Sequence, residues 1–162
     1  MFCASIRPSD LQKYDDLMIR AFTPTDMDAV LGVWLNASIQ AHDFVAPDYW
    51  VARGDDMQQV HLPASESWVY EEDGEVLGFL SLVDATLAAL FVAPGRQGEG
   101  IGARLLEHAQ RLRPELELRV YAANTRSIAF YEKHGFRRQA RQPDGHTGHE
   151  EWTMTWASPH SA

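Results

Sequence analysis

The sequence is poor in cysteine and in long apolar runs. Cys3 is the single cysteine among 162 residues, so an internal disulfide framework is excluded and a reducing compartment is favoured. No apolar run reaches the length of about 18 residues that a membrane-spanning helix needs, and the N-terminus lacks the apolar segment of a signal peptide. These absences predict a cytoplasmic protein without a membrane partner.

Basic residues are scarce as well. The chain has 14 Lys and Arg against 23 Asp and Glu, which gives a formal net charge of −9. A nucleic-acid-binding domain usually carries a basic patch, so we expect no nucleic-acid partner. The acidity favours a cationic or neutral partner, and it also serves solubility. Because 45% of the residues are hydrophobic, the chain has enough apolar surface for one packed domain.

The most informative stretch is rich in glycine and runs from Val92 to Ala103. An apolar run from Leu87 to Val92 precedes it, and an amphipathic segment from Ala103 to Leu112 follows, which predicts a strand, a turn and a helix. Glycine allows a ligand to approach the main chain closely. The free N–H groups of the first helical turn, with the positive end of the helix dipole behind them, attract a phosphate or pyrophosphate.

Other glycine-rich motifs fit this stretch less well. A P-loop would need Gly-Lys-Ser/Thr, and a Rossmann fingerprint would need its glycines near the start of a βαβ unit. An ordinary strand-to-helix turn remains an alternative. The residues Gln97-Gly98-Glu99-Gly100-Ile101-Gly102, after Val92-Ala93-Pro94, resemble the acetyl-CoA loop of the GCN5-related N-acetyltransferases (GNAT).

A second segment, from Asn124 to Phe136, resembles the other signature of the same family, N-x-x-A/S-x-x-F-Y-x-x-x-G-F. The stretches Ala41–Phe44 and Trp68–Gly74 are similar to those of a bacterial single-domain subgroup. The resemblance implies an enzyme that transfers the acetyl group of acetyl-CoA to a primary amine: a protein lysine, an N-terminus or a small molecule. It is compatible with a monomer or a homodimer. A non-catalytic acyl-CoA-binding or sensing module on the same fold is the alternative.

The order of expected elements is β-α-α-β-β-β-α-β-α-β-β, which predicts an α/β fold with a mixed sheet and helices on both faces. This is also the order of the GNAT fold. We expect residues 1–17 to be an extension outside the core, residues 18–157 to form the acetyltransferase domain, and residues 158–162 to be a tail. The expected helices cover 26–38, 48–60, 100–113 and 125–134. The expected strands cover 19–22, 67–71, 76–82, 86–92, 116–121, 136–142 and 151–156.

The resemblance also implies the cosubstrate site. The strand that ends at Phe91 and Val92 should splay from its neighbour and receive the pantetheine arm, with Asn124 bonding to it. The loop N–H groups should hold the pyrophosphate, and Tyr131 should protonate the leaving sulfur as the general acid. The residues expected to bind acetyl-CoA are Phe91, Val92, Gln97, Gly98, Glu99, Gly100, Ile101, Gly102, Ala103, Asn124 and Tyr131.

The general base is less well defined, because Thr86 stands where many family members carry a catalytic Glu. His42 has a suitable pKa and is our first candidate. Asp43, Asp84 and Glu117 remain alternatives, as does a relay through water. A metal site is not expected, because His146 and His149 lack further ligands. A set of aromatic residues is expected either to wall an acceptor pocket or to pack in the core: Phe44, Tyr49, Trp50 and Trp152.

Overall fold

A computed structural model describes residues 18–159, so the expected extension and the last residues of the expected tail lie outside the described part. The strands are β1 (Ile19–Ala21), β2 (Glu66–Glu72), β3 (Glu75–Val83), β4 (Thr86–Val92), β5 (Glu115–Tyr121), β6 (Arg137–Pro143) and β7 (Glu150–Ala157). The longer helices are α2 (Met27–Ala41), α5 (Ile101–Leu112) and α6 (Thr125–Lys133), with shorter pieces at α3 (Pro47–Ala52), α4 (Gly54–Asp56), η1 (Pro24–Asp26), η2 (Met57–His61) and η3 (Pro94–Arg96).

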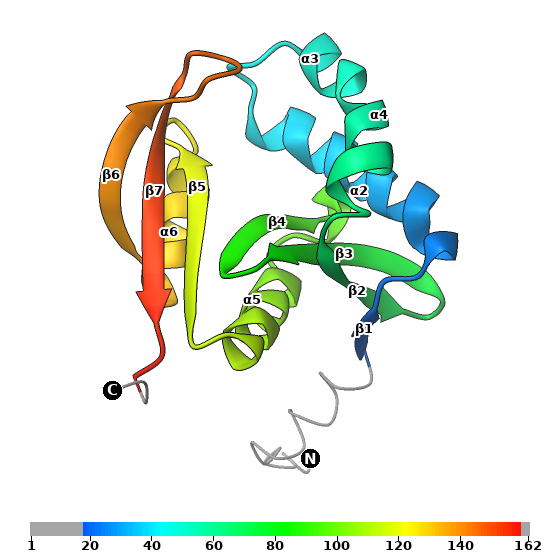
Figure 1. Cartoon of the computed structure of the whole chain (residues 1–162). Helices are drawn as coiled ribbons and strands as arrows, with labels where there is room; N and C mark the ends of the chain where they lie inside the picture. The colour runs from blue at the N-terminus through cyan, green and yellow to red at the C-terminus, as the bar shows by residue number, and fades with distance from the viewer. Residues whose placement is uncertain (1–17, 160–162) are drawn as a thin grey trace, which may run out of the picture.

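The seven strands form one mixed sheet in the order β1-β2-β3-β4-β5-β7-β6. Every neighbouring pair is antiparallel except β4 and β5, which run parallel in the middle of the sheet. Figure 1 shows that β4 and β5 diverge, so that β2 to β4 and β5 to β7 form two limbs. The expected mixed α/β fold is confirmed, and the divergence places an opening at its centre.

Helices cover both faces of the sheet, and each face has its own core. On one face, the buried side of α5 packs through Leu105 and Leu106 against strand residues such as Leu80 and Leu118. On the other face, Val30 and Trp34 of α2 pack with Phe79. Along β5 the buried and exposed residues alternate, as expected for a strand with one covered face.

The turn between β2 and β3 is a two-residue hairpin. Glu72 pairs with Glu75, and the two residues between them, Asp73 and Gly74, both have positive φ, of 52° and 77°. This is the conformation that an Asp-Gly hairpin favours. The turn therefore sets the pairing next to it, and the register shifts once further along, between Tyr70 and Glu71.

The helical segments near the N-terminus differ in detail from the prediction. The first helix continues past Ser38 to Ala41. Pro47 opens the second segment as predicted, but the segment breaks near Gly54 and ends in a five-residue π-helical turn at His61. Glycine has low helix propensity, which accounts for the break. Among residues 18–159, no helix is both long and apolar enough to cross a membrane.

Candidate active site

The opening between β4 and β5 begins after the residue pair at which the two strands are aligned. Thr86 and Glu117 are the single aligned pair, supported by the Glu117 N–H, which donates to the Ala85 carbonyl over 2.9 Å. Directly after this pair, Ala88 is an extra residue in β4, because Ser81 pairs with Ala89 and Leu82 with Leu87. A bulge bends and twists a strand. The bulge therefore turns the second half of β4 away from β5.

The register also shows which main-chain groups of β4 face this opening. The Ala93 N–H donates to the Leu77 carbonyl over 2.8 Å, and in an antiparallel pair such bonded positions alternate. The main chain of Phe91 therefore pairs with β3, whereas that of Leu90 and Val92 points toward β5. Of the two strand residues expected to bind acetyl-CoA, Phe91 and Val92, the main chain of Val92 faces the opening, as does that of Leu90.

The glycine-rich loop places free N–H groups at the end of β4. Gly98 and Gly100 both have φ of 84°, a left-handed conformation that strains any residue with a side chain. The hydrogen-bond ladder of α5 begins at the Arg104 N–H, which bonds to the Gly100 carbonyl. The N–H groups of residues 101–103 precede that ladder and have no helical partner. This arrangement suits an anion such as a pyrophosphate.

Two side chains hold the loop in place. Gln97 donates from Nε2 to the Val92 carbonyl over 3.3 Å. Arg96 forms ion pairs with Glu99 over 2.7 Å and with Glu72 over 3.0 Å. The guanidinium of Arg96 lowers the pKa of the Glu99 carboxyl and offsets its negative charge. A carboxylate within an anion-binding loop is therefore compatible with a phosphate ligand.

Asn124 lies beyond the end of β5 and begins α6. Its Oδ1 accepts a hydrogen bond from the Ser127 N–H over 3.3 Å, so it caps the helix. Its Nδ2 lies 3.5 Å from Nε2 of His42, at the end of α2. The structure therefore joins two of the predicted site residues, which are 82 positions apart in the sequence.

His42 is buried among aromatic rings. It stacks on Trp50 with centroids 5.1 Å apart and meets Phe44 and Tyr121 edge-on at 5.7 and 5.2 Å. Burial lowers the pKa of His42, and the backbone of Ser38 partly opposes this shift. The ring is therefore neutral at pH 7 and can accept a proton.

Tyr131 lies on the same helix as Asn124 and is half-buried against the core next to α5. Its ring contacts Phe130 and Phe136, with centroids 5.3 and 5.6 Å apart. Within residues 18–159 its hydroxyl makes no hydrogen bond, and burial raises its pKa well above that of free tyrosine. A phenol of this kind stays protonated and can act as a donor.

Comparisons with known proteins agree with this geometry. Residues 63–138 match the acetyltransferase (GNAT) domain. The chain is 35% identical over 140 residues to the peptidyl-lysine N-acetyltransferase YiaC of Escherichia coli, covering 86% of this chain and 96% of the relative. The chain belongs to the GNAT family. It is accordingly an acetyl-CoA-dependent N-acetyltransferase, with acetyl-CoA as its cosubstrate.

Solved structures show the same fold. The apo form of YjaB from Escherichia coli superposes with a TM-score of 0.76 at 26% identity, covering 86% of this chain and 97% of that one. The PaiA N-acetyltransferase of Thermoplasma acidophilum, solved with coenzyme A, superposes with a TM-score of 0.72 at 18% identity and covers the same 86% of this chain. The GNAT fold is thus established over nearly the whole described part.

The other candidate bases lie in different places. Asp43 follows His42 but is exposed. Asp84 is at the turn between β3 and β4, where its carbonyl bonds to Arg113, at the closed end of the opening. Glu117 is exposed on β5 and aligns with Thr86, so its carboxyl group lies beside the position at which many GNAT enzymes carry Glu.

The four expected aromatic residues do not form one wall. Phe44, Tyr49 and Trp50 gather near His42, and His149 packs edge-on against Phe44 at 5.1 Å. Trp152 instead packs with the core on the α5 face and lies under the guanidinium groups of Arg138 and Arg141. Trp152 also lines a second open hollow of about 520 Å³ together with His149, so the four residues fall into two groups.

The sequence reasoning missed the contacts that fix the loop between β6 and β7. The Tyr121 hydroxyl donates to Asp144 over 2.8 Å, and Asp144 also accepts from the N–H and hydroxyl of Thr147. These bonds hold the loop over the end of β5, close to Phe44 and His149. Nothing in the sequence indicated that Tyr121 is the partner of Asp144.

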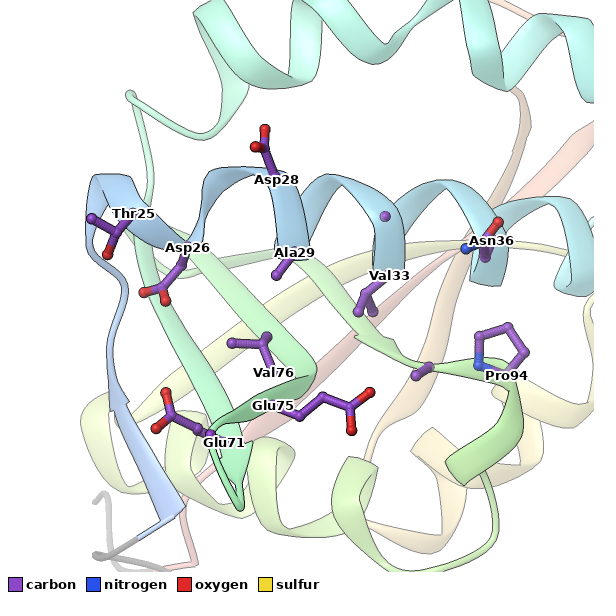
Figure 2. A pocket seen from close by; sticks show the side chains of 13 residues that line it. Thr25, Asp26, Asp28, Ala29, Val33, Asn36, Glu71, Glu75, Val76 and Pro94 are labelled. Carbon is purple, nitrogen blue, oxygen red and sulfur yellow. The ribbon is translucent and has the colours of Figure 1, made fainter.

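One open hollow of about 510 Å³ lies between α2 and the β2–β3 hairpin, with Pro94 at one end (Figure 2). Its lining includes the acidic residues Asp26, Asp28, Glu71 and Glu75. Arg20 is bonded to Asp26 and Glu71, but carboxylates remain in excess. Such a lining does not attract phosphate, so this hollow is not a candidate for the cosubstrate.

Proposed function

We propose that this enzyme acetylates the ε-amine of protein lysines, with His42 as the general base and Tyr131 as the general acid. The observation that carries the proposal is the contact between Asn124 and His42, which brings a neutral, buried imidazole to the open end of the β4–β5 gap. The names of two relatives, the peptidyl-lysine N-acetyltransferases YiaC and YjaB, support the choice of acceptor.

Each residue has a defined role in this proposal. The main chain of Leu90 and Val92 and the side chain of Asn124 hold the pantetheine arm, and the N–H groups from Gln97 to Ala103 hold the pyrophosphate. Held between the limbs, acetyl-CoA supplies an activated acyl group close to the amine. The attacking amine displaces Asn124 Nδ2 from the lone pair of His42 Nε2, and that lone pair then takes the proton of the amine nitrogen. Tyr131 gives its proton to the sulfur as the bond from the acyl carbon to sulfur breaks.

Glu117 is the second candidate for the base, because its alignment with Thr86 places a carboxyl group beside the strand position that lacks one. It lies at the closed end of the gap and is exposed, so it would act through water. A His42→Gln variant and a Glu117→Gln variant separate the two. The base is the residue whose loss removes the acid limb of the pH–rate profile.

The experiment that tests the activity is a screen of amine acceptors. We expect coenzyme A thiol release with lysine-containing peptides, and mass spectrometry should find the acetyl group on the lysine side chain. Peptides with only an N-terminal amine and small amines serve as comparison acceptors. If acetyl-CoA binds by calorimetry but no amine releases thiol, the chain is instead an acyl-CoA-binding module.

A further inference from the structure

We infer that Asn124 is a positioning residue for His42: it fixes the tautomer of the imidazole so that Nε2 is unprotonated and faces the open end of the gap. The inference deepens the proposed function. Its catalytic consequence rests on His42 being the general base. The structural part, which tautomer is present and what holds it, stands on the contacts alone.

The helix cap determines which way the Asn124 amide points. Oδ1 accepts from the Ser127 N–H, and an N–H group cannot donate to an NH₂ group. The other end of the amide, Nδ2, is therefore the atom that faces His42 Nε2 at 3.5 Å. Nδ2 is only a donor, so Nε2 must offer its lone pair. The proton of the neutral ring then resides on Nδ1.

The other ring nitrogen, Nδ1, does not oppose this assignment. It is buried and makes no hydrogen bond among the described residues. The tautomer is therefore determined at Nε2, where Asn124 is the partner.

No charged side chain of the described region is in contact with the His42 ring to override this choice. The rings packed on it are Trp50 of α3, Phe44 of the following loop and Tyr121 of β5. The nearest ionisable groups stand behind these rings: Asp144 is bonded to the Tyr121 hydroxyl, and His149 packs on Phe44. Among residues 18–159, the Asn124 amide is thus the one polar side chain in contact with Nε2.

The same amide couples two parts of the catalytic apparatus. Through Oδ1 it caps α6, the helix that carries Tyr131, and through Nδ2 it orients the base at the end of α2. One side chain therefore contacts both the helix that carries the proton donor and the residue that accepts the proton. A substitution that keeps the cap but changes the group facing His42 isolates the second role.

Asn124→Asp is that substitution. Asp caps a helix as well as Asn does, but it places a carboxylate oxygen against Nε2. An opposite charge at this distance favours the imidazolium and raises the pKa of His42 by about 1 unit or more. Asn124→Ser is the matched control, because Ser also caps the helix but is too short to hold Nε2 as the amide does.

The measurement is long-range nitrogen-15 NMR of the histidine side chains in the protein without acetyl-CoA, assigned with His42→Gln. We expect hydrogen on Nδ1 in the wild type, a raised pKa in Asn124→Asp, and a mixture of tautomers in Asn124→Ser. The acid limb of kcat/KM should move to higher pH in Asn124→Asp by the same amount as the NMR pKa. Circular dichroism checks that each variant is folded.

Two results would overturn the inference: hydrogen on Nε2 in the wild-type protein, or an unchanged His42 pKa in folded Asn124→Asp. A failure of the proposed function looks different. If the NMR results are as expected but His42→Gln keeps wild-type turnover, the positioning by Asn124 stands and the assignment of His42 as the base falls.

Discussion

At the residue scale, burial shifts the pKa values of both proposed proton carriers. It lowers the pKa of His42 and raises the pKa of Tyr131. Burial disfavours the charged form of any side chain. It therefore keeps the His42 imidazole unprotonated and the Tyr131 hydroxyl protonated over the neutral range. These are the forms that a base and an acid need before the reaction starts.

Replacement of Tyr131 by Phe tests the acid. The ring contacts with Phe130 and Phe136 survive, so acetyl-CoA affinity should change little, while turnover at saturating acetyl-CoA should fall roughly 10²- to 10⁴-fold. Tyr70→Phe is the matched control, since that hydroxyl bonds to Met18 and Arg104 instead of facing the reaction. Turnover of Tyr131→Phe within about threefold of the wild type would assign the proton to water.

The pH dependence of kcat/KM tests the base. Because burial lowers the pKa of His42, the neutral form persists below the pH at which free histidine titrates, about 6.5. We expect the acid limb of the profile to have its midpoint below that value and to disappear in His42→Gln. A limb centred well above it, in enzyme shown to be folded at each pH, would contradict this assignment.

A third residue-scale prediction concerns stability. Asp26 is buried, and two hydrogen bonds of 2.8 Å from Arg20 lower its pKa to about 2. A carboxyl group whose pKa is depressed on folding stabilises the protein above its unfolded pKa, near 3.9, and loses that contribution as the pH falls through the folded value. Asp26→Asn should therefore cost about 2 kcal/mol at pH 7.

Urea titrations at two pH values measure this cost. The difference in unfolding free energy between wild type and Asp26→Asn should shrink as the pH approaches 2, because wild-type Asp26 is then largely protonated. A difference that is independent of pH would mean that the variant acts through its hydrogen bonds to Thr23 and not through charge.

At the scale of the element, β4 acts as an edge strand over its second half, although it lies in the middle of the sheet. The amides of Leu90 and Val92 face the gap, whereas those of Phe91 and Ala93 point toward β3. We expect hydrogen exchange to be fast at Leu90 and Val92 and slow at Phe91 and Ala93, and acetyl-CoA to slow the first pair selectively.

Gly100→Glu provides the control for this exchange experiment. It puts a side chain on a residue with φ of 84° and a carboxylate in the loop, so acetyl-CoA should no longer protect Leu90 and Val92. The space around the Cβ position of Gly100 is open, so the expected structural cost is the backbone strain of the positive φ, and circular dichroism checks that the variant is folded. Equal protection of all four amides would show that acetyl-CoA does not lie along β4.

The elements that the sequence predicted well are those with strong local signals. The strand Thr86–Val92 was placed without error, because an apolar run, a proline and a glycine-rich loop bound it. The bulge at Ala88 and the direction of the main-chain groups of Leu90 and Phe91 were not predictable, because they depend on pairing with β3. The contact of Asn124 with His42 depends on how two helices, distant in the sequence, pack on the sheet, so local sequence does not predict it.

At the scale of the molecule, the net charge of −9 favours cationic acceptors. For a lysine peptide with basic neighbours, kcat/KM should fall severalfold between low salt and about 0.3 M salt, because ions screen long-range attraction. The kcat should stay nearly constant. A peptide with acidic neighbours is the control. An equal or larger fall of kcat/KM for that peptide would show that the net charge does not favour cationic acceptors.

The single aligned pair between β4 and β5 has a consequence beyond catalysis. Because Thr86 and Glu117 are the single aligned pair between β4 and β5 among the described residues, the two limbs of the sheet are paired at one position unless another molecule binds between them. A ligand that binds only the folded state adds RT ln(1 + [L]/Kd) to the free energy of unfolding, about 2.7 kcal/mol when it is 100-fold above its Kd. The resistance of this enzyme to proteolysis should therefore rise with the concentration of acetyl-CoA.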